Sequence, residues 1–355
     1  MGYLSLSGKS HNIANNNGKR KPPILIIFVS AIIIIASLIT LLPAAKKNRS
    51  KRWQTIRPPH EVSAMVGKGN VIWAGGRDGV YKIDKDTGEM LAELKCDIPL
   101  SYVRALLFDP SGLLWIAHFS GLSSYDGTAC KTYSKTDGLP DERVNALYLD
   151  RSGRLWIGTW AGAAVYDGKG FSKFLPVSRL ADEMVNVIME DSSGGMWFGS
   201  YTAPNGGLSC CKNGQCRHFT VKEGLPHNNI TSLLETADGE LWVGTGFVDK
   251  GGAVRFIKSE NGWSLAGSLS KNDGLAGNKV RYIYQDKKGD VWYSSEYDGI
   301  AIRSNKRWKI VTVDDGLSDN EVKVMLEDSN GSLWLGTRDG ITKITQKELE
   351  EISLR

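Results

Sequence analysis

The sequence predicts an all-β fold built from seven copies of one unit, and three observations support this prediction. The motif D-x-x-G-x-x-W occurs five times, at residues 109–115, 150–156, 191–197, 286–292 and 328–334. Counting Trp73 and Trp242, seven tryptophans recur at intervals of 42, 41, 41, 45, 50 and 42 residues, and six of them follow a Val or Ile by twelve residues. A period near 40 residues with about four strand-like runs is typical of propeller blades. We therefore expect a seven-bladed β-propeller of four-stranded blades, preceded by one transmembrane helix.

Each copy is expected to fold as four strands. In the third copy, residues 144–149 alternate in polarity and lead into the Asp-x-x-Gly turn, where the glycine can adopt a positive φ and the Asp side chain can bond the turn backbone. Residues 155–159 form the second strand, whose tryptophan is sized to fill the gap between neighbouring sheets. Residues 163–167 and 171–174 are expected to form the third strand and the outer strand.

The two ends of the propeller are predicted to share one blade. The seventh copy contains only three strands before residues 347–355, which are expected to be an acidic tail. Residues 52–57 resemble the outer strand of the sixth copy, residues 307–311, so they can supply the missing strand. Such sharing closes the ring and hides sheet edges. The predicted propeller spans residues 52–346.

Charge and length exclude several classes of protein. Residues 1–57 hold ten Lys and Arg and no acid, which leaves 34 basic against 39 acidic residues in the rest of the chain. The propeller itself is mildly acidic, so a nucleic-acid partner is not expected. The repeats occupy residues 60–345 and leave no room for a kinase, a DNA-binding module or a receiver domain.

The amino-terminal region predicts a membrane anchor. Residues 1–22 are polar and basic and are expected to be disordered. Residues 23–43 contain nineteen consecutive uncharged residues, about 28 Å as a helix, which is enough to cross a bilayer, and residues 44–51 form a basic linker. A cleaved signal peptide is the alternative.

The orientation of this anchor follows from two opposing arguments. Four Lys and Arg precede the apolar segment and six follow it up to Arg57, which would keep the propeller in the cytoplasm. Long folded domains, however, translocate largely regardless of charge, and the cysteines suit an oxidising space. We expect a single-pass inner-membrane protein whose propeller lies outside the cytoplasm, in the periplasm.

Five cysteines are present, and one pair is a disulfide candidate. Asn213 and Gly214 form a two-residue hairpin signal that places Cys211 opposite Cys216. A zinc site is the alternative, but His218 is the only additional ligand nearby, and no metal is predicted. Cys96 and Cys130 are expected to pack as small apolar residues, and the odd total leaves at least one free thiol.

The repeat and its lead-in resemble a known family. The stretch Asp137-Gly138-Leu139-Pro140 with the motif at 150–156, and further lead-ins at 223–226, 273–275 and 315–317, are similar to the two-component regulator propeller repeat. This resemblance implies an extracytoplasmic sensing domain of the kind found in bacterial hybrid sensor kinases and in stand-alone envelope proteins. Hybrid sensors of this kind usually carry two propellers and a carboxyl-terminal kinase, whereas this chain has one ring. A sensing role would therefore need a separate membrane signalling partner.

A ligand is expected on one face of the ring. The loop that enters the first strand and the loop after the second strand open on the same face of a blade, and ligands prefer such loops. Aromatic rings with amide, Arg and acid groups suit a small-molecule, oligosaccharide or peptide ligand. The loops after the second strands contribute Arg77, Asp78, His118, Phe119, Trp160, Tyr201, Phe247, Asp249, Glu296, Tyr297, Asp298, Arg338 and Asp339, and the lead-in loops contribute Arg143, Asn145, Asn186, His227, Asn228, Asn229, Asn278, Arg281 and Asn320.

Three functions remain open on the sequence. A ligand sensor is favoured through the family resemblance, and an envelope scaffold for other proteins is the alternative. A third possibility is an enzyme similar to streptogramin lyase, a resemblance that implies histidine and acid near the channel with a metal; His118, His227 and Glu296 are the candidates that could approach the channel mouth. No paired catalytic constellation or Gly-rich phosphate loop is visible, so neither catalysis nor a cofactor is expected.

Overall fold

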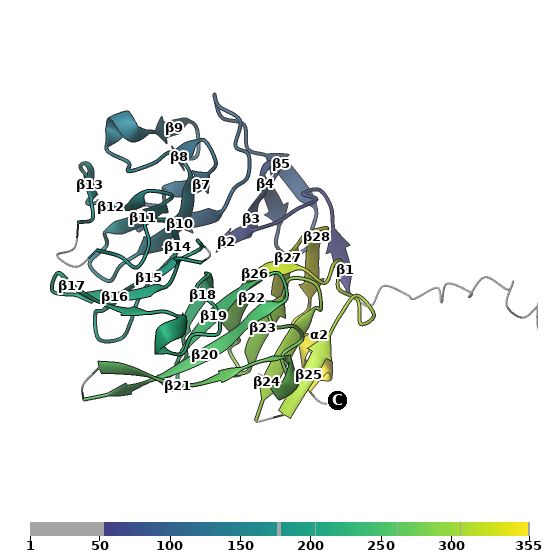
Figure 1. The fold of residues 1–355 in the computed structure, drawn as a ribbon. Coiled ribbons are helices and arrows are strands. Elements are labelled where there is room, and N and C mark those ends of the chain that lie inside the picture. Colours follow the sequence, from purple (N-terminus) through teal and green to yellow (C-terminus); the bar gives the residue numbers. More distant parts are fainter. Residues whose placement is uncertain (1–52, 176–178, 203, 261, 306, 354–355) are drawn as a thin grey trace, which may run out of the picture. The chain divides into compact units, whose positions relative to one another are not determined.

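The computed structural model describes residues 53–353 except 176–178, 203, 261 and 306, and it contains seven four-stranded antiparallel sheets arranged around a common centre (Figure 1). This confirms the predicted seven-bladed β-propeller. Among the described residues, no helix has the length and apolar character needed to cross a bilayer. The predicted tail (1–22), transmembrane segment (23–43) and linker (44–51) lie outside the described residues.

Six blades are formed by four consecutive strands. Blades 1 and 2 are β2 (Ala64–Lys68), β3 (Val71–Gly76), β4 (Gly79–Asp84), β5 (Met90–Glu93), and β6 (Ala105–Phe108), β7 (Leu114–His118), β8 (Gly121–Tyr125), β9 (Cys130–Tyr133). Blades 3 and 4 are β10 (Val144–Leu149), β11 (Leu155–Thr159), β12 (Gly162–Tyr166), β13 (Phe171–Lys173), and β14 (Val185–Glu190), β15 (Met196–Ser200), β16 (Leu208–Lys212), β17 (Gln215–Phe219). Blades 5 and 6 are β18 (Ile230–Glu235), β19 (Leu241–Phe247), β20 (Lys250–Ser259), β21 (Gly262–Leu269), and β22 (Val280–Gln285), β23 (Val291–Ser295), β24 (Ile300–Ser304), β25 (Arg307–Val311).

Blade 7 joins the two ends of the propeller. It combines β26 (Val322–Glu327), β27 (Leu333–Thr337) and β28 (Gly340–Ile344) with β1 (Gln54–Ile56), which pairs antiparallel to β28. The predicted closing strand is therefore present. Residues that follow β28 form helix α2 (Gln346–Ser353), whose Ile352 is buried beside Trp53. The predicted tail is therefore helical for most of its length, and Ile352 and Leu349 give this segment an apolar face that packs on the core of blades 6 and 7.

Three short 3₁₀ helices stand in the lead-in loops: η1 (Lys135–Asp137), η2 (Val221–Glu223) and η3 (Lys271–Asp273). In η1, the Ser134 hydroxyl caps the turn and the Asp137 carboxylate accepts the backbone N–H of Ser134 at 2.8 Å. Gly138 ends the turn with a φ of 111°, a conformation that favours glycine. This explains why Gly follows the acid in the lead-in motif.

The repeated tryptophans are core residues, as predicted. All seven are buried, between 0% and 8% exposed, and each packs toward the next blade. Trp156, for example, lies in one cluster with Val185, Ile188 and Phe198 of blade 4. Trp334 of blade 7 packs against Val62 and its neighbours in blade 1, so the same contact closes the ring. The tryptophans therefore fill the gaps between adjacent sheets.

The motif Asp has a second role beyond the predicted turn. In blade 3, Asp150 Oδ1 accepts backbone N–H groups of Ser152 and Arg154 at 3.0 and 2.9 Å. Its other oxygen, Oδ2, accepts the indole N–H of Trp156 at 2.8 Å. The motif spacing thus pairs the turn with the buried aromatic ring, which would otherwise leave its N–H unsatisfied.

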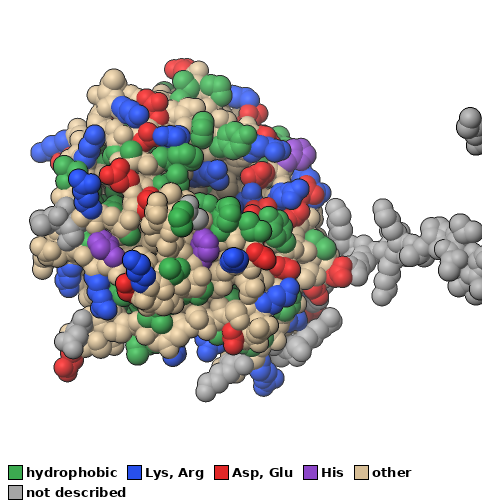
Figure 2. Space-filling view, in the orientation of Figure 1, with side chains coloured by type: hydrophobic (Ala, Val, Ile, Leu, Met, Phe, Trp, Pro, Cys, Tyr) green, Lys and Arg blue, Asp and Glu red, His purple; other side chains and the backbone are tan. Residues whose placement is uncertain are grey.

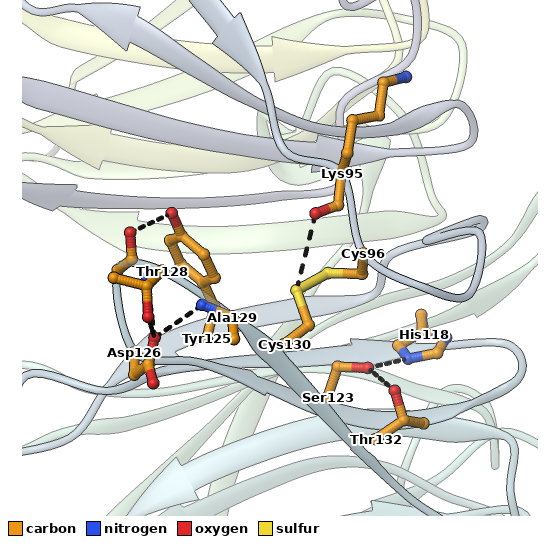
Figure 3. The surroundings of a disulfide bond; sticks show 11 residues. Lys95, Cys96, His118, Ser123, Tyr125, Asp126, Thr128, Ala129, Cys130 and Thr132 are labelled. Carbon is orange, nitrogen blue, oxygen red and sulfur yellow. Dashed lines mark hydrogen bonds between the residues drawn. A yellow bond between two sulfur atoms is a disulfide. The ribbon is translucent and has the colours of Figure 1, made fainter.

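Two disulfides are present among the described residues. Cys211 and Cys216 are directly opposed in the β16–β17 hairpin and are bonded, with Asn213 at a φ of 51° in the turn. Cys96 and Cys130 are also bonded, which corrects the expectation that they pack as separate apolar residues (Figure 3). Cys96 lies in the segment between β5 and β6 and Cys130 begins β9, so this disulfide ties the connection between blades 1 and 2 to the outer strand of blade 2. The remaining cysteine, Cys210, is a free thiol whose pKa is raised by burial to about 12.

Candidate functional site

One position in every blade faces the mouth of the central channel. It is the residue that follows the buried Val or Ile at the entry to the first strand, and we call the seven residues the channel ring: Ser63, Arg104, Asn145, Asn186, Thr231, Arg281 and Lys323. In blades 3 to 7 the register of the first strand shifts at this residue, as between Val144 and Ala146. A β-bulge of this kind redirects a side chain. The bulge therefore turns these five side chains out of the ladder and toward the channel.

The channel ring surrounds a cavity of about 700 Å³. Figure 2 shows a hollow near the middle of the molecule with hydrophobic and basic side chains around it. Besides the channel ring, the wall includes Met65, Leu106, Trp160, Tyr201 and Tyr282. A cavity of this size can accommodate a small organic ligand.

The short polar members of the channel ring hold neighbouring blades together. Ser63 Oγ donates to the carbonyl of Val103, Asn145 Nδ2 to Val185 and Asn186 Nδ2 to Ile230, at 2.7, 3.2 and 3.0 Å. Thr231 Oγ1 donates to Val280 in the same way at 2.6 Å. Each acceptor belongs to the following blade. These four side chains therefore have a structural role in addition to any contact with a ligand.

The other three members of the channel ring are cations. Lys323 Nζ lies 2.8 Å from Glu61 and 3.5 Å from Glu321, and Arg281 lies 3.4 Å from Glu321. Burial raises the pKa of Glu61, but the hydrogen bond from Lys323 and the positive charge of Lys323 bring this pKa below its ordinary value. The Glu61 carboxylate therefore stays ionised. Arg104 lines the same cavity from blade 2. The mouth of the channel is thus charged, with basic and acidic groups close together.

Aromatic side chains lie in the loops at the channel mouth, and two of them, Trp160 and Tyr201, line the cavity. Trp160 is 39% exposed, donates its indole N–H to Asn145 Oδ1 at 3.2 Å and lies under the guanidinium of Arg143 at 4.2 Å. Tyr201 also lines the cavity. Phe119 is half exposed and meets Tyr102 edge-on, with ring centroids 6.1 Å apart. These rings offer flat apolar faces beside the polar channel.

Backbone hydrogen bonds show that the predicted loops share one face. Trp160 N donates to Arg143 O at 3.2 Å, and Tyr201 N donates to Met184 O at 3.3 Å. Both bonds join the loop after a second strand to the lead-in of the same blade. The two loop sets therefore meet at the channel mouth, as the sequence predicts.

A second, smaller cavity of about 360 Å³ lies on the loops of blades 5 and 6. Asp249, Tyr297 and Asp298 line it, together with Glu296 and Lys279. Glu296 forms an ion pair with the buried Lys279. The ammonium of Lys279 also lies 5.9 Å from the ring of Phe247. These predicted residues gather beside the channel rather than in it.

Several residues that were predicted on the ligand-binding face line neither of the two cavities. Asn228 donates to Pro204 O at 2.6 Å and accepts from Val221 N at 2.8 Å, so it fixes the lead-in loop. Asp339 pairs with Arg57 at 2.6 Å and joins the ends of the propeller. Arg77 and Asp78 form an exposed ion pair at 3.5 Å, and Arg338 is exposed on blade 7.

His118 is not available to a ligand, which corrects its assignment to the ligand-facing loop. The ring is fully buried, and Nε2 lies 2.9 Å from Ser123 Oγ (Figure 3). Burial lowers the pKa of His118 to about 4, so the ring is neutral at pH 7. The other candidate histidine, His227, stacks near Phe247 with centroids 6.3 Å apart. Within the described residues, no three His, Cys, Asp or Glu side chains form a group that could hold a metal.

Sequence reasoning missed four members of the channel ring: Ser63, Arg104, Thr231 and Lys323. The signal that could have found them is positional. Each directly follows one of the repeated Val or Ile residues that mark the start of a first strand. Aligning the seven copies on that residue yields the whole channel ring.

A comparison with protein families identifies the repeats. Five segments, residues 138–161, 179–202, 224–247, 274–297 and 316–339, match the model described as Two component regulator propeller. These five repeats belong to the two-component regulator propeller repeat family. Each match runs from a lead-in loop, across the first two strands, to the loop after the second strand, so the family motif includes the channel ring position. No curated protein sequence matches the chain.

Solved structures show the same fold at low identity. The extracellular domain of the hybrid two component system BT3049 from B. thetaiotaomicron is similar with a TM-score of 0.71 and 23% identity, over 83% of this chain and 40% of that chain. Virginiamycin B lyase from Staphylococcus aureus has a TM-score of 0.65 and 15% identity, over 83% of this chain and 98% of that chain. PorZ, a surface component of the type-IX secretion system of Porphyromonas gingivalis, has a TM-score of 0.62 and 16% identity, over 81% of this chain and 46% of that chain. The chain thus spans less than half of the BT3049 domain.

Proposed function

We propose that the chain is a membrane-anchored propeller outside the cytoplasm that binds a small-molecule or oligosaccharide ligand at the channel mouth and passes its state to a separate signalling partner. One observation carries this proposal: the bulged channel ring and the aromatic rim of Trp160 and Tyr201 surround a single cavity. Two-component regulator propeller repeats supply the link to signalling.

The position outside the cytoplasm is supported by the two disulfides, because such bonds persist in oxidising compartments. The apolar segment at residues 24–42 supports the anchor. Alkaline phosphatase, which is active only outside the cytoplasm, can be fused to the carboxyl end. We expect an active fusion. An inactive phosphatase fusion together with a fluorescent cytoplasmic reporter at the same point would contradict the proposed orientation.

Ligand binding can be tested by thermal unfolding of the full chain in a mild detergent, against neutral oligosaccharides, acidic oligosaccharides, peptides and small metabolites. A ligand at a hundred times its dissociation constant should stabilise the fold by about 2.7 kcal/mol. We expect Trp160→Ala and Tyr201→Ala to abolish the shift, because both side chains line the cavity. Ile310→Ala, an exposed position on β25, is the matched control and should leave the shift intact.

The result also separates sensing from the scaffold alternative. A scaffold has no need of a small ligand, so no compound would shift the unfolding midpoint and the Trp160 and Tyr201 variants would behave like the wild type. That outcome would contradict the proposed function.

A further inference from the structure

One cation of the channel ring, Arg104, differs from the other two in its contacts with the residues that the structure describes. Arg281 and Lys323 are paired with the two carboxylates of Glu61 and Glu321. The guanidinium of Arg104, by contrast, makes no ion pair or hydrogen bond with any residue that the structure describes, although it lines the cavity and is exposed to the lumen. The charge of Glu61 acts on Arg104 as well, but the three cations of the channel ring share only the two carboxylates of Glu61 and Glu321, which leaves one positive charge over.

The surroundings favour an anion at this point. Arginine presents five N–H donors in a planar fork and remains protonated in proteins. Loss of hydration in the channel, and next the positive charge of Arg281, lower the pKa of Arg104 from its usual value, although the charge of Glu61 raises it. An anion between these side chains would relieve the repulsion between them, and charge-assisted hydrogen bonds are strong where water is partly excluded.

The charge and shape of the site select among anions. A single uncompensated cation matches a ligand group with one negative charge. Glu61 and Glu321, which pair with Lys323 and Arg281, would repel a phosphate dianion more strongly than a singly charged carboxylate. A planar carboxylate also fits the guanidinium fork with two parallel hydrogen bonds.

We propose that Arg104 is the carboxylate anchor of the channel and that the ligand is an acidic oligosaccharide of the uronic-acid type. This inference rests on the proposed ligand-binding function and makes it more specific. The rings of Trp160 and Tyr201, which line the cavity, supply flat faces on which sugar rings can stack, and a cavity of about 700 Å³ is large enough for more than one sugar unit. Arg104 then holds the carboxylate while the aromatic rim holds the adjoining ring.

The test compares one saccharide with and without its charge. Trigalacturonate and its fully methyl-esterified form are titrated into the full chain by calorimetry at fixed ionic strength. We expect the acid to bind and the neutral ester to bind much more weakly. In Arg104→Gln, the affinity for the acid should fall about 10- to 100-fold, since one charge-assisted pair is lost. Arg104→Lys keeps the charge but not the fork, and should lie between the two.

Two controls test whether the loss of affinity is specific to Arg104. Lys347→Gln removes the same charge from the exposed start of α2, beside the Asp328–Gly331 turn at the opposite ends of the strands, and should bind like the wild type. The guanidinium of Arg104 makes no ion pair or hydrogen bond with the described residues, and the charges of Glu61 and Arg281 act on it in opposite directions, so Arg104→Gln should unfold at the wild-type temperature without ligand. A loss of affinity in a normally folded variant is therefore a loss of the anchor.

Several outcomes would overturn the inference. Equal binding of acid and ester, unchanged affinity in Arg104→Gln, or no binding of trigalacturonate would each do so. Tighter Arg104-dependent binding of a tripeptide carboxylate than of trigalacturonate would overturn the assignment to a sugar. A neutral oligosaccharide that depends on Trp160 but not on Arg104 would also overturn it, while the proposed ligand-binding function would stand.

Discussion

Asp191 accepts a hydrogen bond of 2.7 Å at Oδ2 from the indole N–H of Trp197, six residues later in the repeat. Its Oδ1 accepts the backbone N–H groups of Ser193 and Gly195 in the turn. Trp263, on the outer strand of the next blade, donates to the same Oδ2 at 2.8 Å. One buried carboxylate thus fixes a turn, the core aromatic of its own blade and the outer strand of its neighbour. The equivalent bond to the repeated tryptophan is present in all five complete copies.

We expect Asp191→Ala to destabilise the propeller by about 2–6 kcal/mol, because two buried indole N–H groups lose their acceptor at about 1–3 kcal/mol each. Urea unfolding of the full chain measures this loss. Asp167→Ala is the matched control, since Asp167 accepts the turn amides of Lys169 and Gly170 but no indole and is exposed. An equal loss in the two variants would show that the turn alone, and not the indole bond, stabilises the repeat.

Acid should weaken the fold through Asp150. Although burial raises its pKa, hydrogen bonds from Ser152, Trp156 and Arg154 lower the pKa of Asp150 from 3.8 to about 2. A carboxyl whose pKa is lower in the folded state contributes stability above pH 4, and this contribution is lost as the pH falls toward 2. The loss is about 2 kcal/mol for this residue. Asp150→Asn should therefore be less stable at pH 7 but lose less stability between pH 4 and pH 2, as measured by urea midpoints across that range.

Asp286 provides a control of opposite sign within the same motif. Burial raises the pKa of Asp286 above its ordinary value, even though its Oδ2 also accepts an indole N–H, from Trp292 at 2.9 Å. A carboxyl whose pKa is higher in the folded state lowers the free energy of unfolding as the pH rises. Asp286→Asn should therefore not reduce the loss of stability of the propeller between pH 4 and pH 2. If both Asn variants flattened the acid transition equally, the assignment of that transition to Asp150 would be wrong.

The two disulfides should differ in their contribution to stability. Cys96 and Cys130 are 34 residues apart, so closing that loop in the unfolded chain is worth about 4 kcal/mol. Cys211 and Cys216 are only 5 apart, and the same model gives about 2 kcal/mol. The double serine variants can be compared by urea unfolding with and without reductant. The expected order would be contradicted if the hairpin pair cost more, or if reductant left the wild type unchanged.

The repeat could be predicted because its information is local. Trp156 and Asp150 recur with one spacing, and each marks a strand or a turn that depends only on neighbours in the chain. The bond between them was not predicted, since spacing does not reveal that Oδ2 points at the indole. The pairing of Cys96 with Cys130 was also missed, because these residues are 34 apart in the chain and only the packing of the connection between blades 1 and 2 on the outer strand of blade 2 brings them together.

The candidate site was predicted in part for a related reason. Asn186 and Arg281 were expected at the channel, but Arg104 was not, because the channel ring is defined by a backbone position and not by a residue type. His118 was placed at the ligand face, although it occupies the end of a second strand where blades 3 and 7 have the buried Thr159 and Thr337. A position that buries a hydroxyl in other copies also buries the imidazole. Aligning the copies by strand end would have revealed this.

The closure of the ring predicts a large effect for a residue far from the channel. Trp53 directly precedes β1, is 2% exposed and packs in one cluster with Val311, Leu333 and Ile352. Truncating a buried tryptophan typically costs about 3–5 kcal/mol, so Trp53→Ala should lower the urea midpoint strongly. The half-exposed Trp160 is the matched control, and its replacement by Ala should cost less than about 1 kcal/mol. Trp53→Ala could instead lower the free energy of unfolding by no more than Trp160→Ala does. In that case the pairing of β1 with β28 would not stabilise the closed ring, and blade 7 would depend on β26 to β28 alone.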